Sequence, residues 1–184
     1  METFISILRG INVSGQKKII MLDLKALYED LGFHNVKTYI QSGNVVFKSV
    51  NEKNLNKKIE TKIFEKYNFF VPVIIRNLEE IKNALLNNPL LKEDNIDLSK
   101  LHITFLEEEP LPENIEKLKE IDQKPDLFKI NKKDIYLYTP NGYGNTKLNN
   151  NFFEKKLKTN ATTRNWKTVN ELLKIANEIS QNNP

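Results

Sequence analysis

The order of residue periodicities along the first 76 residues constrains the fold most. Runs typical of β-strands alternate with runs in which apolar residues recur every three or four positions, as they do on one face of an α-helix. The order is β, α, β, β, α, β, which is the ferredoxin-like or split βαβ pattern. The expected strands span 3–8, 36–41, 45–48 and 69–75, and the expected helices span 21–31 and 55–67.

Two short segments set the details of this first sheet. Ser42, Gly43 and Asn44 separate the second and third strands, and this is the composition of a tight hairpin turn. Pro72 lies within the last strand, where a missing N–H donor favours an edge position or a distorted start.

The pattern begins again after a linking helix over 78–87 that ends near Pro89. Thr168 and Glu171 have the T-x-x-E spacing of a capping box and mark the expected start of a last helix. No closing strand is obvious in this second half. Its expected strands span 101–106, 127–130 and 135–138, and its other expected helices span 112–121 and 148–157.

We therefore predict an α+β protein with two ferredoxin-like subdomains, each built on an antiparallel sheet. The first subdomain covers 1–90 and includes the linking helix, and the second covers 91–184 and includes the C-terminal helix. The sequence leaves open whether the second subdomain is complete, because its last strand is not obvious. The boundary is placed between about residues 88 and 98.

Catalytic and metal-binding residue types are scarce in the sequence. The chain has no cysteine, which excludes thiol nucleophiles and thiolate metal sites. Its two histidines, His34 and His102, are far apart and lack the H-E-x-x-H spacing of a zinc site. We predict no metal and no cofactor, and assign no catalytic residue.

The N-terminal residues lack the features of a secretory leader. An acid occupies position 2 and only a short apolar run precedes Arg9, so the basic region and apolar core of a signal peptide are missing. No apolar stretch approaches the roughly 18 residues that a membrane span needs. We expect a cytoplasmic protein without a membrane partner.

Charge is unevenly distributed along the 184 residues, although the formal net charge is only +4. Residues 1–90 carry a net charge of +4, residues 91–128 of −6 and residues 129–184 of +6. Blocks of charge usually form solvated surfaces, and this interpretation stays open. The alternative is a surface that attracts an anionic partner.

The loop over 10–18 has glycines at the G-x4-G spacing of a phosphate-binding P-loop. A P-loop needs lysine directly after its second glycine, whereas Gln16 follows Gly15 here. A weaker feature remains, because Arg9, Lys17 and Lys18 accompany glycines that can turn backbone N–H groups toward an anion. A turn that simply needs positive φ explains the glycines equally well.

Two later segments combine polar and aromatic residues. The loop 141–147 has two glycines, a tyrosine and a lysine, and is either a plain connection or a ligand contact. Residues 162–166 hold the only tryptophan and one of three arginines, just before the last helix. Arginine beside an indole can bind a base or a phosphate, but Trp166 can equally anchor the core.

Four strings in the sequence resemble those of a known family. LRGINV at 8–13, TYIQSGNVVF at 38–47, GYGNTKL at 142–148 and TTRNWKTV at 162–169 are similar to segments of the bacterial domain of unknown function 1697 (DUF1697) family. The resemblance implies an α+β protein with ferredoxin-like subdomains, in agreement with the pattern above. It implies no established activity, cofactor or catalytic residue.

The functional hypothesis is a binding module for a phosphorylated or otherwise anionic ligand, where the two subdomains meet. Polar residues at the ends of elements suit this role, because backbone donors are free there. One alternative is nonspecific nucleic-acid binding through 129–184, and another is an enzyme acting on a phosphorylated substrate. The candidate ligand-binding residues are Arg9, Asn12, Gln41, Ser42, Asn44, Lys147, Arg164, Asn165 and Trp166.

Overall fold

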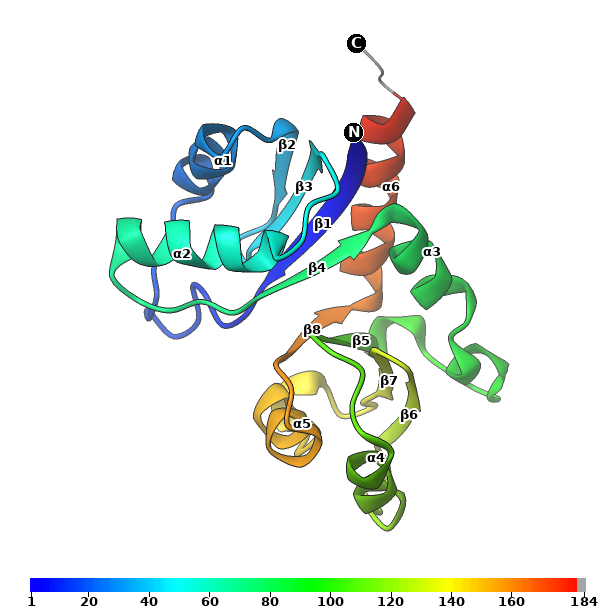
Figure 1. Cartoon of the computed structure of the whole chain (residues 1–184). Helices are drawn as coiled ribbons and strands as arrows, with labels where there is room; N and C mark the ends of the chain where they lie inside the picture. Colours follow the sequence, from blue (N-terminus) through cyan, green and yellow to red (C-terminus); the bar gives the residue numbers. More distant parts are fainter. Residues whose placement is uncertain (182–184) are drawn as a thin grey trace. The chain divides into compact units, whose positions relative to one another are not determined.

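The computed structural model describes residues 1–181 of the chain and divides into two compact units (Figure 1). Unit 1 comprises Met1–Lys82 together with the last helix from Glu171 onward, and unit 2 comprises Asn83–Asn170. Each unit contains a four-stranded antiparallel sheet. The predicted α+β class with two ferredoxin-like subdomains is confirmed.

The sheet of unit 1 has the strand order β2-β3-β1-β4. β4 lies at the edge, as Pro72 predicted, and begins directly after this residue. The elements are β1 (Glu2–Leu8), α1 (Met21–Asp30), β2 (His34–Tyr39), β3 (Asn44–Ser49), α2 (Leu55–Tyr67), β4 (Val73–Asn77) and α3 (Leu78–Leu86), which continues into unit 2.

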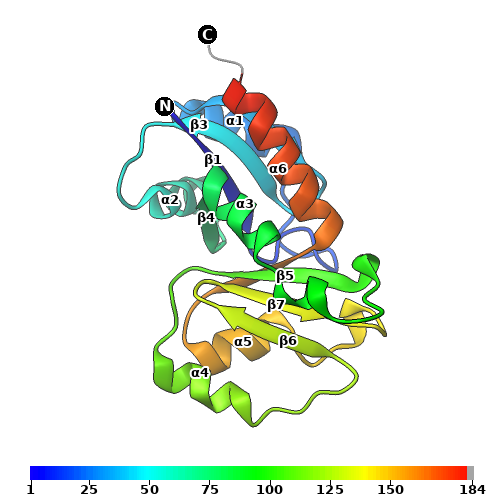
Figure 2. The same ribbon diagram turned by 90° about the vertical axis from the view of Figure 1, so that its right-hand side faces the viewer.

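An aromatic cluster fills the space between this sheet and the helices α1 and α2. The ring of Phe47 stacks on Phe33 at 4.6 Å and meets the edge of Tyr28 at 5.3 Å. The hydroxyl of Tyr28, which is fully buried, lies 2.6 Å from Ser6 Oγ. The C-terminal part of α6 runs along the other face of the sheet (Figures 1 and 2).

The sheet of unit 2 has the order β6-β7-β5-β8, which repeats the plan of unit 1 strand for strand. Leu106, Leu137 and Phe153 belong to the core between this sheet and its helices. The elements are two 3-10 turns (Pro89–Lys92 and Leu98–Lys100), β5 (Leu101–Leu106), α4 (Pro112–Lys119), β6 (Leu127–Asn131), β7 (Asp134–Tyr138), a third 3-10 turn (Tyr143–Asn145), α5 (Asn150–Leu157), β8 (Ala161–Asn165) and α6 (Trp166–Gln181).

Unit 2 contains the closing strand that the sequence left open, because β8 pairs with β5 along its whole length. The strand has the sequence ATTRN and contains no large apolar residue, so it carries no hydrophobic alternation. Its Ala161, Thr162 and Arg164 are nevertheless buried. Pairing with β5 thus creates a strand that local pattern alone does not indicate.

The predicted capping box at Thr168 and Glu171 is also wrong. Helix α6 begins at Trp166, and Asn165 Oδ1 accepts a hydrogen bond from Thr168 N at 2.7 Å. Asparagine is as good a cap as threonine, and here it ends the strand directly before the helix.

The strands β4 and β8 show the internal repeat most clearly. Arg76 lies opposite Ile5 of β1, and Arg164 lies opposite Ile103 of β5. Both arginines are buried, and each is followed by an asparagine that caps the next helix. A buried arginine followed by a helix-capping asparagine is therefore found in the edge strands β4 and β8 of both sheets.

Within residues 1–181 no helix has both the length and the apolar composition required to cross a bilayer. The cytoplasmic location stays a prediction.

Candidate functional site

The candidate ligand-binding residues divide between the two units. Arg9, Asn12, Gln41, Ser42 and Asn44 lie in unit 1. The remaining four, Lys147, Arg164, Asn165 and Trp166, lie in unit 2.

Asn12 holds the loop after β1 against the β2–β3 hairpin. Its Nδ2 donates to Ile19 O at 2.9 Å and to Gln41 O at 2.8 Å, while its Oδ1 accepts from Ile19 N at 2.9 Å. The backbone of Asn12 has a φ of 56°, in the left-handed region that asparagine tolerates. The side chain of Asn12 therefore fixes the position of the loop after β1 relative to the hairpin.

Gly43 brings the tip of the hairpin into direct contact with the same loop. Its carbonyl accepts a hydrogen bond from Leu8 N at 2.8 Å. A Cβ at this position would lie 2.7 Å from Ile11 Cδ1 and 2.8 Å from Leu8 Cβ, and the φ of Gly43 is +79°. Only glycine allows the two segments to approach this closely.

A third segment, 68–72, completes this surface. Arg9 N donates to Pro72 O at 2.9 Å, and Lys17 Nζ donates to Phe70 O at 2.7 Å. We call the surface formed by residues 9–20, 40–43 and 68–72 the loop end of unit 1. It combines parts of two of the family-like strings with a segment that carries the exposed Phe70.

Asn44, the asparagine of the hairpin, is buried inside the turn. Asn44 Nδ2 donates to Tyr39 O and to Ser42 Oγ, both at 3.0 Å. Gln41 is exposed and Ser42 is half-buried. Of the three hairpin candidates, Gln41 is the most accessible to a ligand.

Lys147 lies in a pocket of unit 2 with a volume of about 230 Å³. The pocket also contains Lys124 and Asp126, and the carboxylate of Asp126 accepts a 2.5 Å hydrogen bond from Thr146 Oγ1. Lys124 Nζ forms an ion pair with Asp122 at 3.7 Å, and both of these side chains are strongly exposed. The remaining lining residues are Gln123, Pro125, Asn141, Gly142 and Asn145.

The last three candidates follow one another at the end of β8. Arg164 Nη1 donates to Thr162 Oγ1 at 3.0 Å and to Thr163 O at 2.9 Å, so the guanidinium bonds its own strand. Asn165 caps α6, as described above. Trp166 is half-buried in the first turn of this helix.

His102 lies at a half-buried position beside the 141–147 loop. Its ring stacks on Tyr143 with the centroids 5.0 Å apart, and its Nδ1 lies 3.1 Å from Lys100 O. Burial lowers the pKa of His102, the hydrogen bond with Lys100 O opposes this shift, and the charge of Lys100 adds to it. Folding therefore favours the neutral imidazole.

Replacing His102 with Gln should flatten the pH dependence of stability in weakly acidic solution. Between the lowered pKa of the folded state and about 6.5, the unfolded chain binds more protons, so the free energy of unfolding rises with pH. Urea unfolding at several pH values would measure this slope. The exposed His34 offers a control, and a slope lost in His34→Gln but kept in His102→Gln would contradict the assignment.

The structure adds residues that were not among the nine candidates. Lys17 was noted near the loop, and its contact with Phe70 O could not be inferred because it joins distant segments. Nothing in the local sequence places Lys124 beside Lys147.

A further pocket of about 440 Å³ in unit 1 is lined by Lys53, Lys57, Lys58 and Lys62 together with Leu31, Asn54, Thr61 and Glu65. Three of these lysines are ion-paired with glutamates, which leaves this pocket a weaker anion site.

Within residues 1–181 no cluster of three or more histidine, aspartate or glutamate side chains is arranged to hold a metal ion.

Comparison with known proteins gives a family and solved structures of similar fold. The family described as a protein of unknown function, DUF1697, matches residues 1–136. The match ends within β7, so the strings at 142–148 and 162–169 lie outside it. No curated protein matches the chain.

One of the similar solved structures is that of the conserved bacterial protein SP0830 from Streptococcus pneumoniae. It is 25% identical to this chain, and the alignment covers 95% of this chain and 98% of the other with a TM-score of 0.76. The two-sheet architecture is therefore shared over nearly the full length of both chains.

Proposed function

The chain belongs to the DUF1697 family, and from the geometry described above we propose that it is a binding module for a phosphorylated or otherwise anionic ligand. We place the site at the loop end of unit 1. The observation that carries the proposal is the charge of the segments that meet there. Residues 3–22, 31–51 and 66–78 contain no Asp or Glu, and the cations Arg9, Lys17 and Lys18 lie in the loop end itself.

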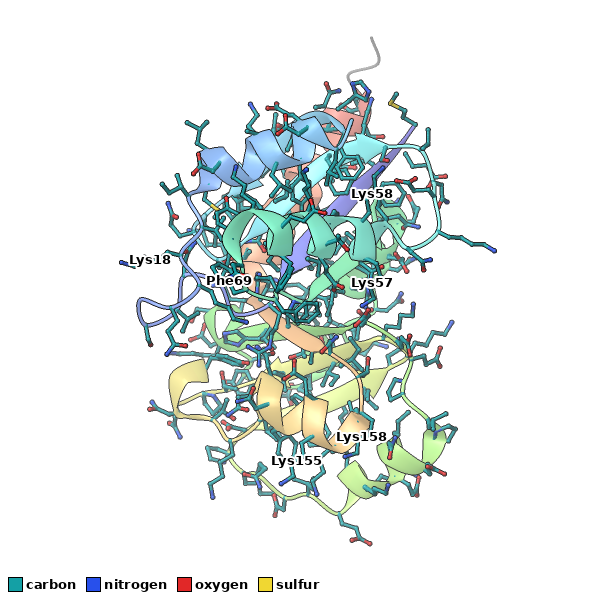
Figure 3. All side chains as sticks on the ribbon, turned by 60° about the vertical axis from the view of Figure 1, so that its left-hand side comes forward. Lys18, Lys57, Lys58, Phe69, Lys155 and Lys158 are labelled. Carbon is teal, nitrogen blue, oxygen red and sulfur yellow. The ribbon has the colours of Figure 1, made fainter. Side chains whose placement is uncertain are left out.

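Two of the cations at the loop end are well placed for an anion. Lys18 is exposed and points away from the ribbon (Figure 3). Lys17 reaches Phe70 O with its ammonium group, which fixes the charge at this surface and leaves further donor capacity. Arg9, at the start of the loop, adds a half-buried guanidinium whose planar donors suit phosphate.

The backbone of the loop supports the same chemistry. Five of the eight residues 10–17 have a positive φ, namely Gly10, Asn12, Ser14, Gly15 and Lys17. Left-handed residues among ordinary ones can turn N–H groups toward an anion. In this loop Asn12 N and Gln16 N donate to Lys17 O and Val13 O, so the other N–H groups would serve a ligand. Asn12 and Gly43 hold this loop in place, so little ordering is needed on binding.

Isothermal titration at low salt tests the proposal with pyrophosphate, glucose 6-phosphate, ATP and a twelve-nucleotide single-stranded DNA. At least one probe should bind, and Lys18→Ala should weaken binding by about tenfold, as expected for one charge-assisted hydrogen bond. Arg9→Ala should weaken it similarly. Lys155→Ala, on an exposed lysine of α5, is the control and should leave the affinity unchanged.

Two further variants separate the alternatives. Lys147→Ala should leave the affinity unchanged if the loop end holds the ligand, whereas a loss would move the site to the pocket of unit 2. A steep salt dependence for DNA alone would favour the nucleic-acid hypothesis, and turnover in a phosphatase and transferase screen would favour an enzyme. Binding of no probe, or an affinity unchanged from that of the original chain in both Lys18→Ala and Arg9→Ala, would refute the proposal.

A further inference from the structure

Large apolar side chains are exposed on the same loop end. Val13 is 60% exposed, Ile20 66% and Phe70 52%, although such residues normally lie inside a protein. Ile40, beside the hairpin tip, is 47% exposed, and Leu22, which follows the loop end in the first turn of α1, is 74% exposed. Exposed apolar side chains that gather on one surface indicate an interaction site.

Printed contacts join the segments that carry these side chains. The hydrogen bond from Asn12 to Gln41 O places the hairpin beside the loop of Val13. The hydrogen bond from Lys17 to Phe70 O places the 68–72 segment against the same loop. Lys66 Nζ lies 3.3 Å from Asp23 O, which joins the end of α2 to the start of α1, next to Leu22.

Basic residues accompany this apolar surface. Lys17 and Lys18 lie between Val13 and Ile20 in the sequence. Figure 3 shows Lys18 beyond the edge of the ribbon and Phe69 between the loop and α2. The acidic residues closest in sequence to the loop end are Asp23, which follows the loop, and Glu65, which precedes the 68–72 segment. Glu65 pairs with Lys62 at 3.5 Å.

We infer that the loop end docks on the surface of an anionic lipid bilayer, a proposal that rests on the anion site described above. Apolar side chains enter the boundary between headgroups and acyl chains, while Lys17 and Lys18 attract anionic headgroups. Such docking needs no membrane-spanning helix. It departs from the sequence-based expectation of no membrane partner, which rested on the absence of a span.

The composition of the surface favours a bilayer over a soluble anion or a nucleic acid. A sugar phosphate makes no use of five exposed apolar side chains. Single-stranded nucleic acid stacks its bases on aromatic rings, whereas Val13, Ile20, Leu22 and Ile40 are aliphatic. An aliphatic surface beside lysines complements both parts of an anionic bilayer.

Sedimentation of the full chain with vesicles tests the inference. Binding is expected to vesicles of phosphatidylglycerol and phosphatidylcholine in equal parts, and to be at least tenfold weaker with phosphatidylcholine alone. Val13→Asp and Leu22→Asp should each reduce binding to the mixed vesicles about tenfold. Val50→Asp is the matched control, because Val50 is as exposed as Val13 but follows the far end of β3.

The outcomes distinguish this inference from the proposed function. If soluble anions bind but the mixed vesicles do not, the docking inference fails and the anion site stands. If Val13→Asp and Val50→Asp weaken vesicle binding equally, or if the oligonucleotide rather than the vesicle loses affinity in Leu22→Asp, the inference is overturned. Leu22→Ser, a neutral change outside residues 9–20, should also weaken binding to the mixed vesicles, and its affinity for the soluble probes should stay within about threefold of that of the original chain.

Discussion

Replacing Gly43 with Ala is expected to lower the free energy of unfolding by about 3 kcal/mol. The new Cβ would lie within 3 Å of side-chain atoms of Ile11 and Leu8, which are themselves buried. A φ of +79° adds a backbone penalty of about 1 kcal/mol for any residue with a Cβ. Denaturant unfolding would measure the difference.

Gly15→Ala is the matched control for this substitution. Gly15 has a φ of +76°, but a Cβ there would meet no atom within 4 Å. Only the backbone penalty of about 1 kcal/mol is then expected. Equal losses in both variants would show that the close approach of the hairpin to the loop contributes nothing.

Gly43→Ala should also weaken anion binding at the loop end. To relieve the contact, the loop must move away from the hairpin, and the hydrogen bond from Leu8 N to Gly43 O lengthens. Titration of the folded variant with the best soluble probe should show a loss larger than that of Gly15→Ala. An unchanged affinity would separate the loop geometry from the binding site.

Glu60→Ala is expected to lower the free energy of unfolding by about 2 kcal/mol. The carboxylate is 3% exposed, accepts Val73 N at 2.9 Å and lies 3.0 Å from Lys57 Nζ. Its removal leaves a buried backbone N–H at the start of β4 without its acceptor, and such a group costs about 1 to 3 kcal/mol. Thermal and urea unfolding would both report the loss.

The repeat supplies an internal comparison for Glu60. In unit 2, Glu154 of α5 accepts a hydrogen bond from Ala161 N, the first residue of β8, at 3.1 Å. Glu154 is more exposed than Glu60, so Glu154→Ala should cost less, because water can replace the lost acceptor. A larger loss in Glu154→Ala would contradict this account.

Much of the fold could be predicted because its elements carry strong local patterns. Leu24 and Leu27 of α1 and Ile59 and Ile63 of α2 recur at helical spacing and are all buried. The strand over 101–106 was predicted with the bounds that the structure gives. Hydrophobic periodicity predicts such elements, since the apolar face that faces the core is written directly in the sequence.

The candidate site was harder to predict, because its residues act through partners distant in the sequence. Asn12 and Asn44 were expected to contact a ligand, and the structure shows their carboxamides bonded to backbone and hydroxyl groups of the loop and the hairpin. Lys147 was selected from its loop, but the pocket it shares with Lys124 forms only when 123–126 folds beside that loop. Residue type indicated the region, and contact geometry assigned the roles.

The amino-acid sequence by itself determined the order of the elements, the two-fold repetition of the pattern and the absence of acids from three long segments. Only the tertiary structure decided that ATTRN is a strand, that Asn165 caps α6, and that the three segments meet at the loop end. The physical reason is the range of the interactions involved. Periodicity and charge are properties of neighbouring residues, whereas strand pairing and side-chain hydrogen bonds depend on groups that only the folded chain brings together.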